Sequence, residues 1–199
     1  MILGYTQPER AKAIVGNDIE QAVYSYELAR SLSMEAKRQN KTAKVHIKLD
    51  TGMGRIGFKA DETAVAQIKD IYNLPNLIIE GMFTHFAIAD EKDKSYTKGQ
   101  FDKFIRVADK LEKEGIFIRL KHCGNSAAII DLPQMHLDMV RAGIILYGLA
   151  PSKDVELDGI NLKQVMSLKA KITHVKEIDA GESVSYGRKF IASQKTKIA

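Results

Sequence analysis

The stretch 43–58, AKVHIKLDTGMGRIGF, constrains the fold more than any other part of the chain. Its first half alternates between apolar and polar residues, which predicts a β-strand. The polar positions of that strand are His46, Lys48 and Asp50. Two glycines and Arg55 follow, so a tight turn presents an arginine where the strand ends. Such a strand either turns its polar face to water or contributes that face to a polar site inside the fold.

The chain up to about residue 150 alternates between strand-like and helix-like segments, which predicts βα units and a parallel sheet. Strands are expected at 1–5, 18–25, 44–50, 77–86, 117–123 and 137–147, and helices near residue 9 and at 26–40, 61–72, 93–115 and 126–131. After residue 151 the pattern becomes that of antiparallel strands, at 166–173 and 184–190, with a turn at Gly181. We therefore expect an α/β domain over 1–160 and the beginning of a β domain over 161–199.

Polar residues also follow three other expected strands, in Thr84-His85, in HCGNS at 122–126 and in Arg141-Ala142-Gly143. Each could be a solvated loop, but four such strand ends in succession are typical of barrel enzymes, whose sites lie at the carboxyl ends of the strands. Charged residues within a strand also fit a barrel interior better than an apolar helix layer. The predicted fold class is α/β: a partial (β/α)8 TIM-type barrel with about six of the eight strands, followed by the start of a β domain.

The composition argues against several classes of protein. The net charge is only +5, and no basic stripe with interleaved aromatic residues predicts nucleic-acid binding. The single cysteine, Cys123, excludes an internal disulfide framework and fits a reducing compartment. No apolar run approaches the roughly 20 residues that span a membrane, and no signal-peptide pattern opens the chain. We therefore expect a cytoplasmic protein.

Three local motifs suggest other chemistries. Residues 52–57 match GxGxxG, but the helical pattern starts only near residue 61, so a dinucleotide site is not predicted. His122 and Cys123 are adjacent and would point to opposite faces of a strand, which does not predict a metal site. Cys123 could be a nucleophile with His85 as its base, although a lone cysteine is commonly a buried small apolar residue.

Five motifs, in this order, resemble those of the alanine racemase family: KLDTGMGRIGF (48–58), THFAIAD (84–90), HCGNSAA (122–128), MVRAGIILYGLAPS (139–152) and GESVSYGR (181–188). The resemblance implies a barrel that binds pyridoxal 5'-phosphate, a C-terminal β domain and a homodimer with its active sites at the interface. It also implies two-base proton transfer that interconverts L- and D-alanine and supplies D-alanine for peptidoglycan. The alternatives are a racemase or decarboxylase of the same cofactor class acting on another amino acid, or a non-enzymatic barrel that binds the cofactor.

The resemblance implies a set of cofactor-binding residues: His85, His122, Asn125, Ser126, Arg141, Gly143 and Ile144. Asn125, Ser126 and the backbone of Gly143 and Ile144 would surround the phosphate. Arg141 would donate a hydrogen bond to the ring nitrogen, with His122 behind it. An equally good interpretation makes His122 a core histidine whose hydrogen bonds are satisfied.

The resemblance implies three catalytic residues: Tyr186, Arg55 and Lys48. Tyr186 would act as a base from the neighbouring subunit, and Arg55 beside it would lower the pKa of the phenol. Lys48 matches a position that is carbamylated in the family to hold that arginine, and an ion pair with Asp50 is the alternative.

One feature of the family is missing from this sequence. The family binds its cofactor covalently through a lysine in a Lys-Ala-Asn/Asp-Ala-Tyr-Gly-His-Gly stretch on the first barrel strand, and no such stretch occurs here. We therefore expect the chain to be an interior piece of a racemase. We also expect that it cannot turn over substrate on its own.

Overall fold

The computed structural model describes residues 1–167, 169, 171–184 and 190–198. These residues form two compact units, Met1–Val165 and Met166–Ala199. The domain boundary expected between residues 160 and 161 stays a prediction. Within the described part of the chain, no helix is both long enough and apolar enough to cross a membrane.

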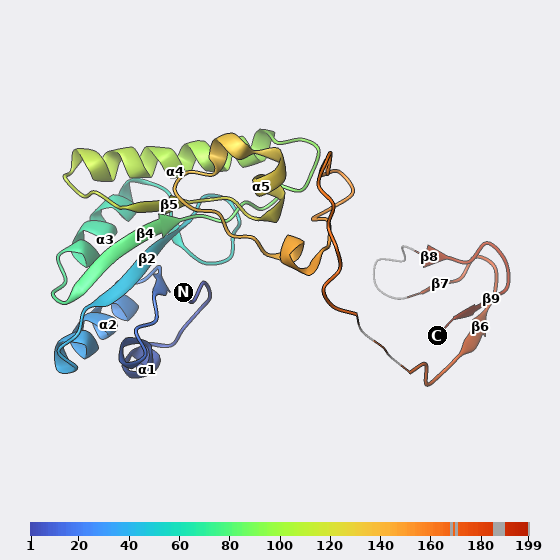
Figure 1. The fold of residues 1–199 in the computed structure, drawn as a ribbon, viewed down its shortest axis with the longest axis horizontal. Coiled ribbons are helices and arrows are strands. Elements are labelled where there is room, and N and C mark those ends of the chain that lie inside the picture. The colour runs from blue at the N-terminus through green and yellow to red at the C-terminus, as the bar shows by residue number, and fades with distance from the viewer. Residues whose placement is uncertain (168, 170, 185–189, 199) are drawn as a thin grey trace. The chain divides into compact units, whose positions relative to one another are not determined.

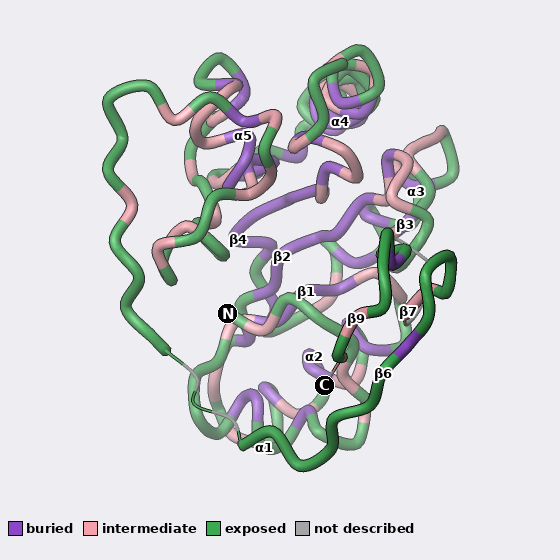
Figure 2. The backbone as a smooth tube through the Cα atoms, turned by 90° about the vertical axis from the view of Figure 1, so that its right-hand side faces the viewer, coloured by how far each residue is buried: buried purple, intermediate pink, exposed green. Residues whose placement is uncertain are grey.

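The sheet of the first unit has its four main strands in the parallel order β1-β2-β4-β5 (β2, β4 and β5 are labelled in Figure 1, and β1 in Figure 2). Their bounds are Gln21–Val23 for β1, Ala43–Asp50 for β2, Leu77–Phe83 for β4 and Leu120–His122 for β5; the short β3, Phe58–Lys59, pairs with the end of β2. Strands that follow one another along the chain are also neighbours in the sheet, so the order never reverses as it does in a doubly wound fold. A sequential parallel order is that of a β/α barrel, and the predicted fold class is confirmed.

The helices are α1 (Ala11–Gly16), α2 (Tyr26–Arg38), α3 (Glu62–Tyr72), α4 (Ser95–Lys113) and α5 (Ser126–Asp131). Three of them begin at a side chain that accepts a backbone hydrogen bond: Ser25 for α2, Asp61 for α3 and Asn125 for α5. Such caps satisfy amides that a helix leaves unpaired at its first turn, so they fix where each helix starts. The expected helices are confirmed.

The two faces of β2 are both buried (Figure 2). Val45, Ile47 and Leu49 have no exposed area and belong to the apolar core beneath the helices. On the opposite face, His46 and Lys48 are only 1% and 3% exposed. The polar face of this strand therefore lies inside the fold and not in water.

Two of the six strands expected in the first unit are wrong. Near the N-terminus only Ile2 forms a bridge, to Gln21. The segment 137–147 contains no strand: the Arg141 N–H donates to the Gly124 carbonyl, and then the chain leaves the sheet at Gly143 and forms a 3-10 turn over Ile144–Tyr147. Gly143 has ψ of −99°, far from the value of an extended strand, so pairing cannot continue through it.

The second unit contains two antiparallel strand pairs. They are β6 (Lys176–Ile178) with β9 (Thr196–Ile198), and β7 (Ser183–Val184) with β8 (Phe190–Ile191). Gly181 has φ of +87° and forms the expected turn before β7. The strand expected at 166–173 is not present among the described residues of that segment, and residues 168 and 170 lie outside them.

Candidate functional site

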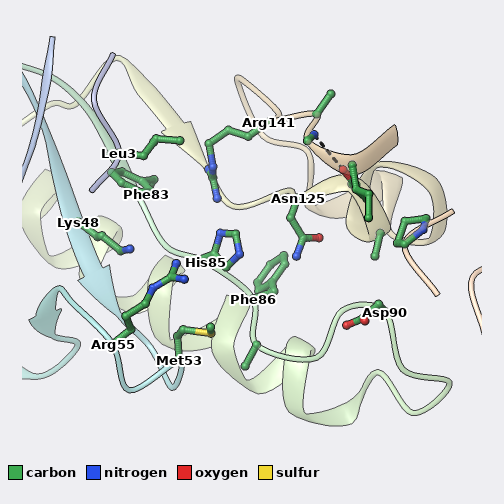
Figure 3. A pocket seen from close by; sticks show the side chains of 17 residues that line it. Leu3, Lys48, Met53, Arg55, Phe83, His85, Phe86, Asp90, Asn125 and Arg141 are labelled. Carbon is green, nitrogen blue, oxygen red and sulfur yellow. Dashed lines mark hydrogen bonds between the residues drawn. The ribbon is translucent and has the colours of Figure 1, made fainter. Parts of the chain in front are cut away.

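A pocket of about 460 Å³ opens where the strands of the first unit end (Figure 3). Its lining includes these residues that the sequence analysis singled out: Lys48, Arg55, His85, Asn125, Ser126, Arg141, Gly143 and Ile144. They come from β2 and the loop after it, the loop after β4, the start of α5 and the segment after it. His122 lies behind Arg141, and Tyr186 lies outside the described residues. The sheet topology thus brings these separated motifs together, while the role of each residue stays a prediction.

Arg141 is held by four acceptors. Its Nη1 donates to Nδ1 of His122 at 2.6 Å and to the His122 carbonyl at 3.1 Å, and its Nη2 donates to the carbonyls of Thr84 at 2.7 Å and Cys123 at 3.2 Å. A guanidinium has five N–H donors. Within the described part of the chain, Nε–H has no hydrogen bond and remains for a ligand. Burial lowers the pKa of Arg141 to about 10, so the side chain stays charged at neutral pH.

Phe83, the last residue of β4, lines the pocket and contacts three polar residues through its ring. Its ring stacks on the His122 ring at a centroid distance of 4.8 Å and an angle of 4°. The Arg141 Cζ lies 5.1 Å from the same ring and the Lys48 Nζ lies 5.5 Å from it. Cations over an aromatic face are stabilised by the ring quadrupole, by about 0.5–2 kcal/mol each. The sequence analysis missed Phe83, because an apolar residue at a strand end has the same pattern as a core residue.

The pocket carries an excess of positive charge. Lys48, Arg55 and Arg141 line it, while its carboxylate among the described residues is Asp90. The pKa of His85 is lowered to about 4, first by burial and then by Arg141, so its ring is neutral. Burial and then Arg141 lower the pKa of His122 to about 3. An excess of fixed cations in a partly enclosed cavity favours an anionic ligand.

Lys48 is a buried amine that forms no ion pair with any residue that the structure describes. Burial, followed by the charges of Arg55 and Arg141, lowers its pKa to about 8. The Asp50 carboxylate instead accepts hydrogen bonds from the N–H groups of Gly52 at 2.9 Å and Gly54 at 3.1 Å. Among the described residues no ion pair joins Lys48 to Asp50, so that alternative is not supported.

Ser126 and Gly143 form the opposite end of the pocket. The Gly143 N–H donates to Oγ of Ser126 at 2.9 Å, the dashed line in Figure 3. Asn125 uses its Oδ1 to accept from the Ala128 N–H at 3.1 Å, which fixes the start of α5 beside them. Ser126 Oγ accepts the bond from Gly143 and keeps its own proton to donate, and a hydroxyl donor beside the backbone amides of Gly143 and Ile144 suits a phosphate group.

Two alternative chemistries find no support at this site. Cys123 is fully buried, does not line the pocket, and burial raises the pKa of its thiol to about 12, which leaves it unreactive. In the GxGxxG motif the glycines do not open a helix, because β3 follows them and α3 begins only at Glu62. That arrangement lacks the helix N-terminus on which a dinucleotide site depends.

Comparisons with known proteins agree with this geometry. The family model for the alanine racemase N-terminal domain matches residues 1–151, and that for the C-terminal domain matches residues 165–199. The chain is 50% identical over its full length to an alanine racemase of Clostridium tetani, of which it covers 51%.

Solved structures match as well. The alanine racemase of Clostridium difficile 630 is 45% identical with a TM-score of 0.82, over 98% of this chain and 51% of that one. A histidine racemase from Leuconostoc mesenteroides is 30% identical with a TM-score of 0.75, over 98% and 52%. The chain thus spans about half the length of the relatives it matches. Because the two family models together cover most of its residues, the chain belongs to the alanine racemase family.

Proposed function

We propose that this chain is part of an alanine racemase that interconverts L- and D-alanine. The family depends on pyridoxal 5'-phosphate. The observation that carries the proposal is the pocket at the carboxyl ends of the strands. There Arg141 contacts residues at the ends of β4 and β5 and keeps one N–H without a partner among the described residues, and the Ser126–Gly143 pair lines the same pocket. These groups come from motifs far apart in the sequence, and a shared cationic pocket explains why they converge.

The residues of the pocket fit this cofactor. Its phosphate is a dianion, and the Ser126 O–H and the Ile144 amide would donate to it. The Gly143 amide donates to Ser126 Oγ in this structure, so it would orient that hydroxyl or turn from it to the phosphate. The pyridine nitrogen is an acceptor, and the Nε–H of Arg141 is a donor without a partner in the described protein. Arg141, Ser126 and Gly143 are therefore the residues that we assign to the cofactor, with Asn125 and His85 beside them.

The bound cofactor supplies a ring that withdraws electrons from the Cα of a substrate amino acid. Arg141 would hydrogen-bond the ring nitrogen and keep its own proton, because even after burial its pKa is about 10. His122 accepts from Arg141 and is neutral, so it orients the guanidinium without adding a charge. An arginine at this position keeps the ring a weaker electron acceptor than a carboxylic acid would, which favours return of the proton to Cα.

Racemisation removes a proton from one face of Cα and returns one to the other face, so two proton-transferring groups on opposite faces are the simplest arrangement. We assign one of them to Tyr186, acting from the partner subunit of a homodimer. Arg55 would lower the pKa of that phenol through its positive charge. Lys48, whose lowered pKa provides a neutral amine near pH 8, would be carbamylated and hold Arg55. We place the protein in the cytoplasm, where it would supply D-alanine for peptidoglycan.

The test uses the protein encoded by the complete gene, loaded with pyridoxal phosphate. Conversion of L-alanine to D-alanine, measured by chiral chromatography and abolished by Arg141→Ala, is expected. Serine, lysine, ornithine and histidine are offered in parallel, because relatives of this fold include a histidine racemase. Faster turnover of another amino acid would overturn the assignment of the substrate. Cofactor binding without any racemisation would favour a non-enzymatic role.

A further inference from the structure

A line of buried polar groups leads from Arg141 away from the pocket. His122 accepts from Arg141 through Nδ1, and its Nε2 lies 2.9 Å from Nδ1 of His46. Nε2 of His46 in turn lies 3.2 Å from Oε2 of Glu20. His122 and His46 are 0% and 1% exposed, whereas the Glu20 side chain is 35% exposed. The line thus begins at the pocket wall and ends at a carboxylate in contact with water.

Elementary hydrogen-bond chemistry fixes the direction of every bond in this line. Arginine can only donate, so Nδ1 of His122 must accept, and the ring proton of His122 is on Nε2. That proton is donated to Nδ1 of His46, so the proton of His46 is also on Nε2 and is donated to Glu20. Both rings must be neutral, because a second proton on either would place two donors against each other. The Glu20 carboxylate at the far end accepts in every orientation, so every hydrogen bond in the line has one donor and one acceptor.

The neighbouring strand leaves room for this arrangement at one residue. His46 on β2 is paired in register with Gly81 on β4. A Cβ atom at Gly81 would lie 2.3 Å from Nδ1 of His46 and 2.9 Å from the Leu120 carbonyl. The absence of a side chain at Gly81 therefore lets the His46 ring reach between the strands toward His122.

We propose that His46 and Glu20 are positioning residues: they supply the acceptors that hold the His122 ring in place and thereby hold the Arg141 guanidinium in its orientation at the pocket. Without Glu20, the Nε2–H of His46 would lose its acceptor. Arg141 would still require the proton of each ring to be on Nε2, but the His46 and His122 rings, and with them the guanidinium, would be held less firmly. The consequence for cofactor binding rests on the proposed function, whereas the tautomers of the two rings do not.

The first experiment needs no variant. Nitrogen-15 NMR of the histidine-labelled 199-residue chain at pH 7 distinguishes protonated from unprotonated ring nitrogens. We expect both His46 and His122 to be neutral with the proton on Nε2. A proton on Nδ1 of either ring, or a doubly protonated ring, would overturn the proposal.

The second experiment compares Glu20→Ala, Glu20→Gln and, as a control, Asp109→Ala, an exposed carboxylate on α4. Glu20→Ala should speed solvent exchange of the His122 Nε2 proton by about three- to tenfold, the equivalent of one hydrogen bond. Glu20→Gln should restore slow exchange, because its amide oxygen can still accept, and Asp109→Ala should have no effect. Equal exchange in Glu20→Ala and the parent chain would refute the positioning role.

A titration with pyridoxal phosphate separates this inference from the proposed function. If the parent chain binds the cofactor, Glu20→Ala should weaken binding by about three- to tenfold and Glu20→Gln should not. Unchanged binding in Glu20→Ala would show that the orientation of Arg141 does not depend on Glu20. Failure of the parent chain to bind would count against the cofactor assignment, and the NMR result would still decide the inference.

Discussion

Substituting alanine for Gly81 introduces one methyl group at a crowded point of the sheet, between the His46 ring and strand β5. The new Cβ would lie 2.3 Å and 2.5 Å from two atoms of the His46 ring and 2.9 Å from the carbonyl of Leu120. The ring cannot retreat freely, because it is held at 2.9 Å from His122 and at 3.2 Å from Glu20. The carbonyl belongs to the neighbouring strand β5, which is paired with β4 at this residue. Both neighbours must therefore move for the methyl group to fit.

The expected loss of stability has two parts. Overpacking of a close-packed interior costs about 1–3 kcal/mol. Displacement of His46 leaves the buried His122 Nε2–H poorly paired, which costs about 1–3 kcal/mol more. The alanine restricts the unfolded chain and returns about 0.4–1 kcal/mol. The net loss is about 1–5.5 kcal/mol, which for a protein of this size lowers Tm by about 2–22 °C.

The assay is urea unfolding of the parent chain and of Gly81→Ala, with Gly99→Ala as the matched control. A Cβ at Gly99, within helix α4, meets no atom within 4 Å. Gly99→Ala should therefore stabilise the chain by about 0.5–1 kcal/mol, as expected for an open helical position. A Gly81→Ala chain within about 0.5 kcal/mol of the parent, the usual scatter of neutral substitutions, would refute the reasoning.

A double-mutant cycle tests the cause of the effect. His46→Ala removes the ring with which the new methyl group collides. The loss in Gly81→Ala/His46→Ala should then be smaller than the sum of the two single losses by at least about 1 kcal/mol, as for residues in contact. Additive losses would show that the collision with His46 is not the cause.

Three further predictions concern the pocket and its surroundings. Arg141→Lys should weaken pyridoxal phosphate binding at least about tenfold in a fluorescence titration, because one ammonium cannot satisfy four acceptors arranged for a guanidinium. Ser126→Ala should weaken binding less, and equal losses in the two variants would contradict the role given to the guanidinium. Lys48 has its pKa lowered from 10.5 to about 8, so the unfolded chain binds more protons between these values. The unfolding free energy of the parent relative to that of Lys48→Met should therefore rise from pH 8 to pH 10.5. A difference between the two chains that does not change with pH would be evidence against the lowered pKa of Lys48. Cys123 should resist iodoacetamide in the folded chain at pH 8 and react after unfolding, as followed by mass spectrometry, since its thiol is buried and its pKa is about 12; rapid alkylation of the folded chain would contradict that burial.

Much of the fold follows from local sequence patterns. The alternation at 43–50 predicts β2, and the polar residues Ser25, Asp61 and Asn125 mark where three helices begin. The prediction of a strand at 137–147 is wrong, because the apolar residues of this segment have the spacing of a strand but its backbone is not paired as one. Ile144, Leu146 and Tyr147 are 43%, 65% and 53% exposed, so their apolar character is not used in the core of this unit. Strand formation depends on a partner for the backbone, and the pairing ends before Gly143.

The residues of the site likewise divide into those that local sequence patterns predict and those that they do not. Polar residues at strand ends predict that Lys48, His85 and Arg141 lie near one another, because parallel strands end at the same edge of a sheet. Their roles come from the resemblance to the family and not from the spacing. Glu20 and Gly81 could not have been found, since their significance depends on a contact with His46 across 26 and 35 residues of sequence. No local pattern encodes such a contact.

The two polar residues on the inner face of β2 show how one strand can provide both rigidity and reactivity. His46 has partners at both ring nitrogens, so its burial is compensated and its position is fixed. Lys48, two residues on, has no hydrogen bond or ion pair among the described residues, and part of the unfavourable free energy of its burial is expressed as a lowered pKa. A paired group is suited to holding Arg141 in place, whereas an unpaired amine is available for covalent modification. The alternation that places both side chains inside therefore puts a fully paired histidine and an unpaired lysine on the same strand, as the proposed supporting role of His46 and the proposed modification of Lys48 require.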